Sequence, residues 1–262
     1  MFTAPEFDID QMNYSDQRLM TPLLYRVVDK ITENPKLVTL SLEPEDQPIE
    51  PVAPGQFNML YAFGIGEIPI SVSSIIKPHP TIMHTVQDVG MVSKAVCKLH
   101  VDDVIGVRGP FGRPFPIEEA KFKDIIIMAG GVGFAPLRPL IEYIAMNRDD
   151  YGEVNFLFGT RDPDNIFFYK DIISLQSDPS INFQITVDHT FTSWRGNVGV
   201  VTNLVEKAEF DPENTVAFVV GPEIMMRYGI YSLQDAFIPD ENIFLSMERN
   251  MKCGVGHCGH CQ

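Results

Sequence analysis

The feature that most constrains the fold is a run of apolar residues at 125–129, which follows Asp124 and leads directly into a glycine turn. A strand that is apolar on both faces is typical of a parallel sheet covered by helices on both sides. The alternation of strand and helix then repeats toward the C-terminus. Strands are predicted at 124–129, 154–158, 183–187, 216–220 and 243–245, and helices at 137–146, 167–175, 202–207 and 224–236. This pattern predicts an α/β doubly wound domain over 121–247.

The preceding part of the chain consists of shorter segments separated by glycine and proline. In one of them, Val38, Leu40 and Leu42 share one face. Strands are predicted at 36–42, 56–62, 68–74, 81–87 and 104–108, and a short helix at 92–99. Short strands at this spacing predict an antiparallel β-barrel over 21–120. Residues 1–20 are polar and acidic, and we expect them to form an N-terminal arm.

The last segment, 248–262, holds three of the four cysteines of the chain, Cys253, Cys258 and Cys261. Their C-x4-C-x2-C spacing is that of the first three ligands of a plant-type [2Fe–2S] cluster, and glycines between them let the backbone curl around the sulfurs. A zinc site completed by His257 or His260 is an alternative, and a disulfide would leave one cysteine over. We expect an incomplete iron–sulfur loop, in a chain that stops before a fourth cysteine.

The charge and hydropathy of the chain limit the binding partners and the cellular location that we expect for it. The net charge is −15, which disfavours nucleic acid and anionic membranes as partners. The sequence has no basic leader and no apolar run of about 18 residues. We therefore expect a cytoplasmic protein without membrane insertion, in a reducing compartment where clustered cysteines favour metal over disulfide.

Two glycine turns are expected at the same edge of the parallel sheet. The turn at Gly131–Gly133 opens a helix whose N-terminus can face a phosphate, and the turn at Gly221-Pro222 ends a later strand. Arg161 follows the second strand, where it is placed to meet a ribose 2′-phosphate. Each motif also has a structural interpretation: ordinary turn chemistry for the glycines, and an ion pair with Asp162 or Asp164 for Arg161.

Polar groups also gather at two points of the predicted barrel. Ser71, Ser73 and Ser74 place three hydroxyls at one strand end. The segment Gly90–Ser93 opens the short helix, where backbone N–H groups can bind an anion. The alternative for this second group is a helix cap without a ligand.

The order of these motifs resembles that of the ferredoxin-NADP reductase superfamily. The motifs are P-I-S-V-S at 69–73, G-M-V-S at 90–93, G-P-F-G at 109–112, A-G-G-V-G-F-A-P at 129–136 and G-P-E-I-M at 221–225. With the cysteine loop, they are similar to the iron–sulfur flavoprotein branch. This branch includes the gamma subunits of cytoplasmic [NiFe] hydrogenases (sulfhydrogenases), a related component of anaerobic sulfite reductase and the dihydroorotate dehydrogenase B electron-transfer subunit. Segments 66–73, 129–139 and 248–254 look most like the hydrogenase gamma subunits.

This resemblance implies a barrel that binds FAD, a second domain that binds NAD(P)H, and a [2Fe–2S] cluster. The implied FAD residues are Pro69, Ile70, Ser71, Val72, His84, Thr85, Val86, Gly90, Met91, Val92 and Ser93, with Ser71 nearest the flavin N5. The implied NAD(P) residues are Gly131, Val132, Gly133, Thr160, Arg161, Gly221, Pro222, Glu223 and Met225. The implied cluster ligands are Cys253, Cys258 and Cys261.

Three positions depart from the family pattern. Ile68 stands where an arginine is common in the flavin motif, and Val220 stands where a cysteine commonly precedes the Gly-Pro turn. The fourth cluster cysteine is absent from the sequence. Asp188 and His189 are expected to be surface residues rather than proton carriers, and Glu248 is expected to approach the flavin.

The expected function is that of an NAD(P)H-dependent flavin oxidoreductase subunit. It would move electrons between NAD(P)H and partner redox subunits through FAD and the cluster, in a [NiFe] hydrogenase complex. One alternative is the diaphorase subunit of a sulfite-reducing or electron-bifurcating complex. A free-standing reductase and a zinc-stapled non-enzymatic adaptor are further alternatives.

Overall fold

The computed structural model describes residues 17–74, 80–190 and 194–261. The chain divides into two compact units. The first contains the chain up to Phe115 together with Arg138–Tyr143 and the C-terminal segment from Glu248, and the second contains Pro116–Leu137 and Ile144–Met247. Most of the expected N-terminal arm lies outside the described residues, and its described end, Gln17–Met20, is a short 3-10 turn. None of the described helices has the length and apolar character needed to cross a membrane.

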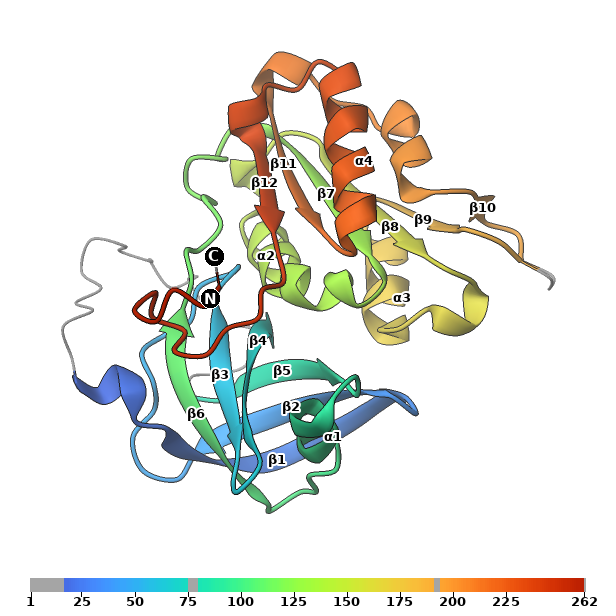
Figure 1. Cartoon of the computed structure of the whole chain (residues 1–262). Coiled ribbons are helices and arrows are strands. Elements are labelled where there is room, and N and C mark those ends of the chain that lie inside the picture. Colours follow the sequence, from blue (N-terminus) through green and yellow to red (C-terminus); the bar gives the residue numbers. More distant parts are fainter. Residues whose placement is uncertain (1–16, 75–79, 191–193, 262) are drawn as a thin grey trace. The chain divides into compact units, whose positions relative to one another are not determined.

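The first unit is built on a closed antiparallel barrel, which confirms the predicted architecture (Figure 1). Its strands follow one another around the barrel in the order β1-β2-β5-β4-β3-β6. Their bounds are β1 Leu23–Asn34, β2 Leu37–Pro44, β3 Phe57–Ala62, β4 Gly66–Ser74, β5 Ile82–Gln87 and β6 Val104–Phe111. The short helix α1, Met91–Cys97, follows β5, and the Lys30 ammonium donates 2.8 Å hydrogen bonds to the carbonyls of Cys97 and Leu99 at its end.

The second unit is built on a parallel sheet in the order β10-β9-β8-β7-β11-β12. The strands are β7 Asp124–Gly130, β8 Val154–Thr160, β9 Asn182–Val187, β10 Asn197–Val198, β11 Thr215–Val220 and β12 Ile243–Ser246. The α-helices that follow these strands are α2 Phe134–Met146, α3 Tyr169–Ser177 and α4 Glu223–Asp235, and the middle of α2, Arg138–Tyr143, is grouped with the first unit. The predicted helix at 202–207 is instead a 3-10 helix, Val201–Lys207, because this short segment contains β-branched residues that disfavour the α conformation.

Both faces of the parallel sheet are covered, as a doubly wound fold requires. On one face, Met128 and Leu157 pack in a core with Met226 and Leu233 of α4. On the other face, the Phe134 ring at the start of α2 lies against three phenylalanine rings. Its ring centroid is 5.0 Å from that of Phe156, 5.1 Å from that of Phe158 and 5.1 Å from that of Phe168. This aromatic cluster fixes the beginning of α2 on the sheet.

We expect Phe134→Ala to lower the free energy of unfolding by about 3–5 kcal/mol, because the Phe134 side chain is fully buried and its removal leaves a cavity among the three rings. Urea unfolding followed by circular dichroism measures the change. Phe237→Ala is the matched control, since Phe237 is 82% exposed and its loss should change stability by less than about 0.5 kcal/mol. Equal stability of the two variants would show that the aromatic cluster around Phe134 does not stabilise the second unit.

Candidate functional site

The parallel sheet brings two glycine turns together at one point of its carboxyl edge. β7 pairs with β8 on one side and with β11 on the other, so the strand order reverses between β7 and β11. Ligands of open α/β sheets bind outside the carboxyl ends of the strands at such a switch point. The turn at Gly131–Gly133 follows β7 and the turn at Gly221-Pro222 follows β11, so both predicted motifs lie at the switch point.

The two turns are in such close contact that side chains are excluded between them. A Cβ atom on Gly133 would contact the Val220 carbonyl and lie 2.9 Å from the Gly221 Cα. A Cβ atom on Gly221 would lie 3.1 Å from the Gly130 Cα. Gly131 has a φ of 54°, in the left-handed region that favours glycine. The sequence therefore needs glycine here for backbone packing between the two turns.

The remaining predicted nucleotide residues surround this point. Met225 on α4 reaches back to Gly130 and Gly221, while Pro222 and Glu223 are exposed at the beginning of that helix. Val132 is half-buried within the first turn. The packing of Met225 against both turns holds them together, a contact that the sequence pattern does not specify.

In the loop after β8, Arg161 is exposed, whereas the side chains of Thr160 and Asp162 on either side of it form hydrogen bonds within the loop. The Thr160 hydroxyl is buried and donates a 2.8 Å hydrogen bond to the Asn165 carbonyl. Asp162 accepts hydrogen bonds from the backbone and side-chain nitrogens of Asn165. The structure shows no ion pair between Arg161 and either Asp162 or Asp164, within the part of the chain it describes. Asp188 and His189 on the next loop are exposed.

In the barrel, the predicted flavin residues lie on adjacent strands, with Val72 of β4 opposite His84 of β5. The His84 ring is fully buried. Its Nδ1 donates a 3.0 Å hydrogen bond to the Ser71 carbonyl, and its Nε2 accepts a 3.1 Å hydrogen bond from the Asn58 side chain. His84 therefore fixes the backbone at Ser71 from inside the barrel. No sequence pattern marks Asn58, a polar residue within an otherwise apolar strand.

Burial lowers the pKa of His84 from 6.5 to about 4. As the pH falls, His84 is therefore protonated in the unfolded chain before it is protonated in the folded protein. The free energy of unfolding is unaffected above pH 6.5 and falls by about 3 kcal/mol in all between pH 6.5 and about 4. We expect His84→Gln to flatten the pH dependence of unfolding between pH 6.5 and 5, measured by urea titration. A wild-type slope in His84→Gln would contradict the assignment.

The other predicted flavin residues are held by local contacts. The Thr85 hydroxyl donates a 3.0 Å hydrogen bond to Ser73 Oγ and lies 2.9 Å from Thr39 Oγ1. Ser93 Oγ accepts a 2.9 Å hydrogen bond from the Gly90 N–H and caps α1, so the capping alternative describes this hydroxyl. The other members are half-buried Pro69, Ile70 and Val92, buried Val72 and Val86, and exposed Met91.

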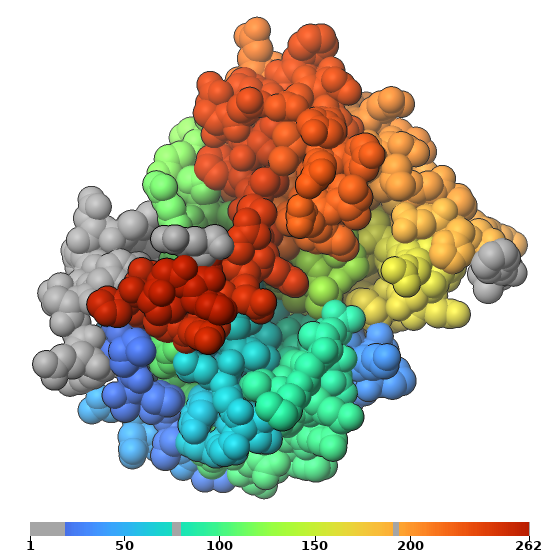
Figure 2. Space-filling view, viewed as in Figure 1, coloured from blue at the N-terminus to red at the C-terminus, as the bar shows by residue number. Residues whose placement is uncertain are grey.

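The cysteine loop belongs to the barrel unit and lies at its surface (Figure 2). Gly254, Gly256 and Gly259 have φ values of 76°, 75° and 67°, so each one turns the chain as only glycine does readily. The loop curls around Cys253 Sγ, which accepts a 3.4 Å hydrogen bond from the Cys258 N–H. Hydrogen bonds from backbone N–H groups, first that of Cys258, lower the pKa of Cys253 to about 6.

This donor chemistry fits a thiolate that binds iron or zinc. Cys258 is exposed and Cys261 half-buried on the same loop. Cys97 does not join them, because its thiol donates a 3.4 Å hydrogen bond to the Val86 carbonyl and burial raises its pKa to about 11. In residues 17–74, 80–190 and 194–261, no group of three or more His, Cys, Asp or Glu side chains is arranged to hold a metal ion.

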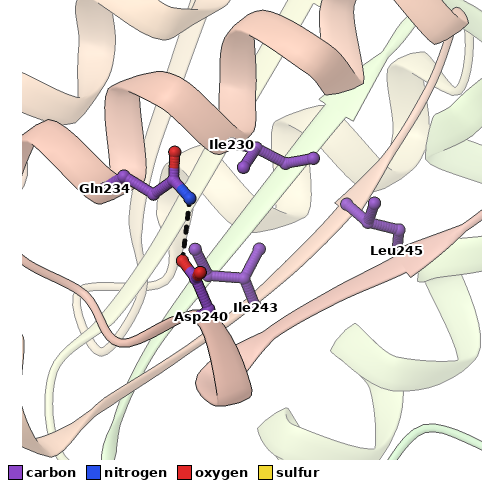
Figure 3. Close-up of a pocket in the computed structure, with 5 residues that line it drawn as sticks. All are labelled: Ile230, Gln234, Asp240, Ile243 and Leu245. Carbon is purple, nitrogen blue, oxygen red and sulfur yellow. Dashed lines mark hydrogen bonds between the residues drawn. The ribbon is translucent and has the colours of Figure 1, made fainter.

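A small pocket lies in the second unit (Figure 3). It is lined by Ile230, Gln234, Asp240, Ile243 and Leu245. The Gln234 amide donates a 2.8 Å hydrogen bond to Asp240 within it. Because Asp240 and Ile243 lie where β12 begins, the pocket is not at the carboxyl edge where the predicted nucleotide residues meet.

Comparisons with known proteins agree with this arrangement. A family model described as an oxidoreductase NAD-binding domain matches residues 127–229. The gamma subunit of sulfhydrogenase 2 from Pyrococcus furiosus is 34% identical over 247 residues, covering 89% of this chain and 85% of the relative. A probable dihydroorotate dehydrogenase B (NAD+) electron transfer subunit from Methanocella arvoryzae is 31% identical, covering 92% and 84%.

A solved structure shares the fold. The structure of an NADH-dependent reduced ferredoxin-NADP oxidoreductase matches with a TM-score of 0.74 and 24% sequence identity. The match covers 90% of this chain and 80% of that one. At this identity the likeness shows the barrel and the parallel-sheet domain as a common fold.

Proposed function

The chain belongs to the iron–sulfur flavoprotein branch of the ferredoxin-NADP reductase superfamily, which contains the sulfhydrogenase gamma subunits, and we propose that it is the electron-transfer subunit of a cytoplasmic [NiFe] hydrogenase complex. It is an NAD(P)H-dependent flavin oxidoreductase. In this proposal it moves electrons between NAD(P)H and partner redox subunits through FAD and a [2Fe–2S] cluster. The observation that carries the proposal is the 34% identity to a sulfhydrogenase gamma subunit across 89% of the chain.

The residues of the chain have distinct tasks in this proposal. The glycine turns at 131–133 and 221–222 admit the dinucleotide pyrophosphate to the start of α2. In the barrel, β4 and β5 line the flavin, and the carbonyl of Ser71 is held in place by His84. When bound, FAD supplies hydride acceptance at N5 and release of electrons one at a time. No general acid or base is required, so the protein contributes position and the exclusion of water.

The cysteine loop holds the cluster in this proposal, with Cys253, Cys258 and Cys261 as ligands. Thiolate ligands suit iron–sulfur clusters, and N–H groups directed at the sulfurs stabilise the charge of the ligand set. The loop is part of the same unit as the barrel, which suits direct transfer from flavin to cluster.

Anaerobic absorption spectroscopy of the purified protein, with metal and flavin analysis, tests the proposal. We expect flavin bands at about 370 and 450 nm over a broader iron–sulfur absorbance, with the flavin bands bleached by NADH or NADPH. Co-purification of hydrogenase subunits would identify the partner. Co-purification of a dihydroorotate dehydrogenase would favour the second family of relatives, at 31% identity. A colourless protein that contains zinc would contradict the proposal.

We expect Arg161→Ala to raise the KM for NADPH about tenfold and to leave the KM for NADH within about twofold. The exposed guanidinium follows β8, and loss of charge-assisted hydrogen bonds to a 2′-phosphate removes about 1.5–3 kcal/mol. Steady-state kinetics with each nucleotide measures the change, with NADH as the internal control. Equal effects on both nucleotides would show that Arg161 does not read the 2′ position.

A further inference from the structure

The guanidinium of Arg108 on β6 is buried and has many hydrogen-bond partners. It is 2% exposed. Its five N–H donors match five oxygen acceptors, which use the full capacity of an arginine. The acceptors are Glu67 Oε2 at 2.8 Å, Glu67 Oε1 at 2.6 Å, and the carbonyls of Cys253 at 2.6 Å, Lys252 at 3.1 Å and Leu19 at 3.2 Å.

These acceptors lie in parts of the chain that are far apart in sequence. Glu67 is on β4, two residues before Pro69 in the flavin motif. Cys253 is the first cysteine of the metal-binding motif, and Lys252 precedes it. One side chain therefore joins the strand of the proposed flavin site to the backbone that carries the first proposed cluster ligand.

The loop also packs directly against the barrel beside Arg108. A Cβ atom on Gly254 would lie 3.2 Å from the Phe111 ring and 3.3 Å from the Met59 side chain. The Arg108 guanidinium lies over the same Phe111 ring, 5.3 Å from its centroid. Glycine at 254 thus lets the loop backbone approach β3 and β6 closely, at the point where Arg108 holds the preceding carbonyl groups.

We propose that Arg108 is a positioning residue that fixes Cys253 relative to β4, and so sets the distance from the flavin to the cluster. This inference rests on the proposed function. A lysine cannot replace Arg108, because an ammonium has three donors and no planar fork to meet Glu67 and the two loop carbonyls together. The Glu67 carboxylate balances the buried positive charge of Arg108 and orients its guanidinium, so we expect Glu67 to contribute to the positioning of Cys253.

Arg108→Lys tests the proposal, with Glu67→Gln as a second variant and Arg26→Lys as the matched control. Arg26 pairs with Glu45 at 2.7 Å on the same barrel, but its side chain is 41% exposed. Hydrogen exchange of residues 250–258 in the purified protein measures loop anchoring. Anaerobic stopped-flow with NADH measures the rate of flavin reduction and the rate at which the cluster is reduced afterwards.

We expect at least tenfold faster exchange of residues 250–258 in Arg108→Lys. The ratio of the cluster rate to the flavin rate should fall at least tenfold, with a smaller change of the same kind in Glu67→Gln and none in Arg26→Lys. Wild-type exchange in both Arg108→Lys and Glu67→Gln would overturn the proposal, as would an unchanged rate ratio in a protein that holds both cofactors. If the wild type holds no flavin or cluster, the proposed function fails, while the exchange data still decide whether Arg108 anchors the loop.

Discussion

Gly133→Ala is expected to weaken binding of the nicotinamide nucleotide at least 100-fold. The added Cβ would contact the Val220 carbonyl and lie 2.9 Å from the Gly221 Cα, and backbone atoms cannot move aside as a flexible side chain can. The two turns must separate, which displaces the N–H groups proposed to bind the pyrophosphate. A 100-fold loss corresponds to about 2.7 kcal/mol of binding free energy. Isothermal titration of the purified protein with NADH and NADPH measures it.

The control for this variant lies in the same turn. A Cβ atom on Gly131 would have no neighbouring atom within 4 Å, although the φ of Gly131, 54°, is unfavourable for alanine. Gly131→Ala therefore carries backbone strain of about 1–2 kcal/mol without a steric clash between the turns. We expect a much smaller loss of nucleotide affinity in Gly131→Ala than in Gly133→Ala. Similar affinities would show that the contact between the turns is not what shapes the nucleotide site.

Cys253→Ser is expected to abolish the cluster and to leave FAD bound. Cys253 is the buried member of the motif, and backbone N–H groups already favour its thiolate by lowering its pKa to about 6. A serine hydroxyl stays protonated and is a poor ligand for iron. We expect loss of the iron–sulfur absorbance and at least a 100-fold fall in NADH-driven electron delivery to a partner protein or one-electron acceptor served by the cluster.

Cys97→Ser is the control for this variant. Cys97 lies on α1 with a pKa raised to about 11, and its thiol contacts the Val86 carbonyl. Its replacement should leave iron content and electron delivery at wild-type levels. The assignment would fail if Cys253→Ser retained iron, or if Cys97→Ser lost it. Reduction of the flavin by NADH serves as the internal reference in both variants.

The architecture was predictable because it depends on patterns that are local in sequence. The apolar run at 125–129 and its glycine turn specify the parallel sheet, and the alternation at 36–42 specifies a barrel strand. β1 was not predicted as a strand, since only Tyr25 and Val27 of its twelve residues are buried and the exposed residues show no regular alternation. β10 has only two residues, too few to carry a periodic signal.

The site was predictable only where a motif is contiguous. Gly133 and Cys253 are marked by their neighbours in sequence, so the motifs that contain them could be located. The function of Arg108 depends on partners 41 and 145 positions away, and nothing in its own neighbourhood distinguishes it from a surface arginine. His84 was predicted near the flavin, but its inward hydrogen bonds to Asn58 and Ser71 depend on barrel closure. Pairings of this kind arise from topology, which local sequence patterns do not encode.

The C-terminal segment of the barrel unit follows the parallel-sheet unit in sequence, and this affects how the protein folds during synthesis. During synthesis, β6 leaves the ribosome long before Lys252 and Cys253 are translated, because the whole parallel-sheet unit is encoded between them. Until those residues arrive, Arg108 lacks two of its acceptors, although domains generally begin to fold from the N-terminus. The barrel unit therefore emerges from the ribosome first, but it is completed only by residues that are translated after the parallel-sheet unit. A nascent or prematurely terminated chain would carry a barrel with an unsatisfied arginine where the cysteine loop belongs.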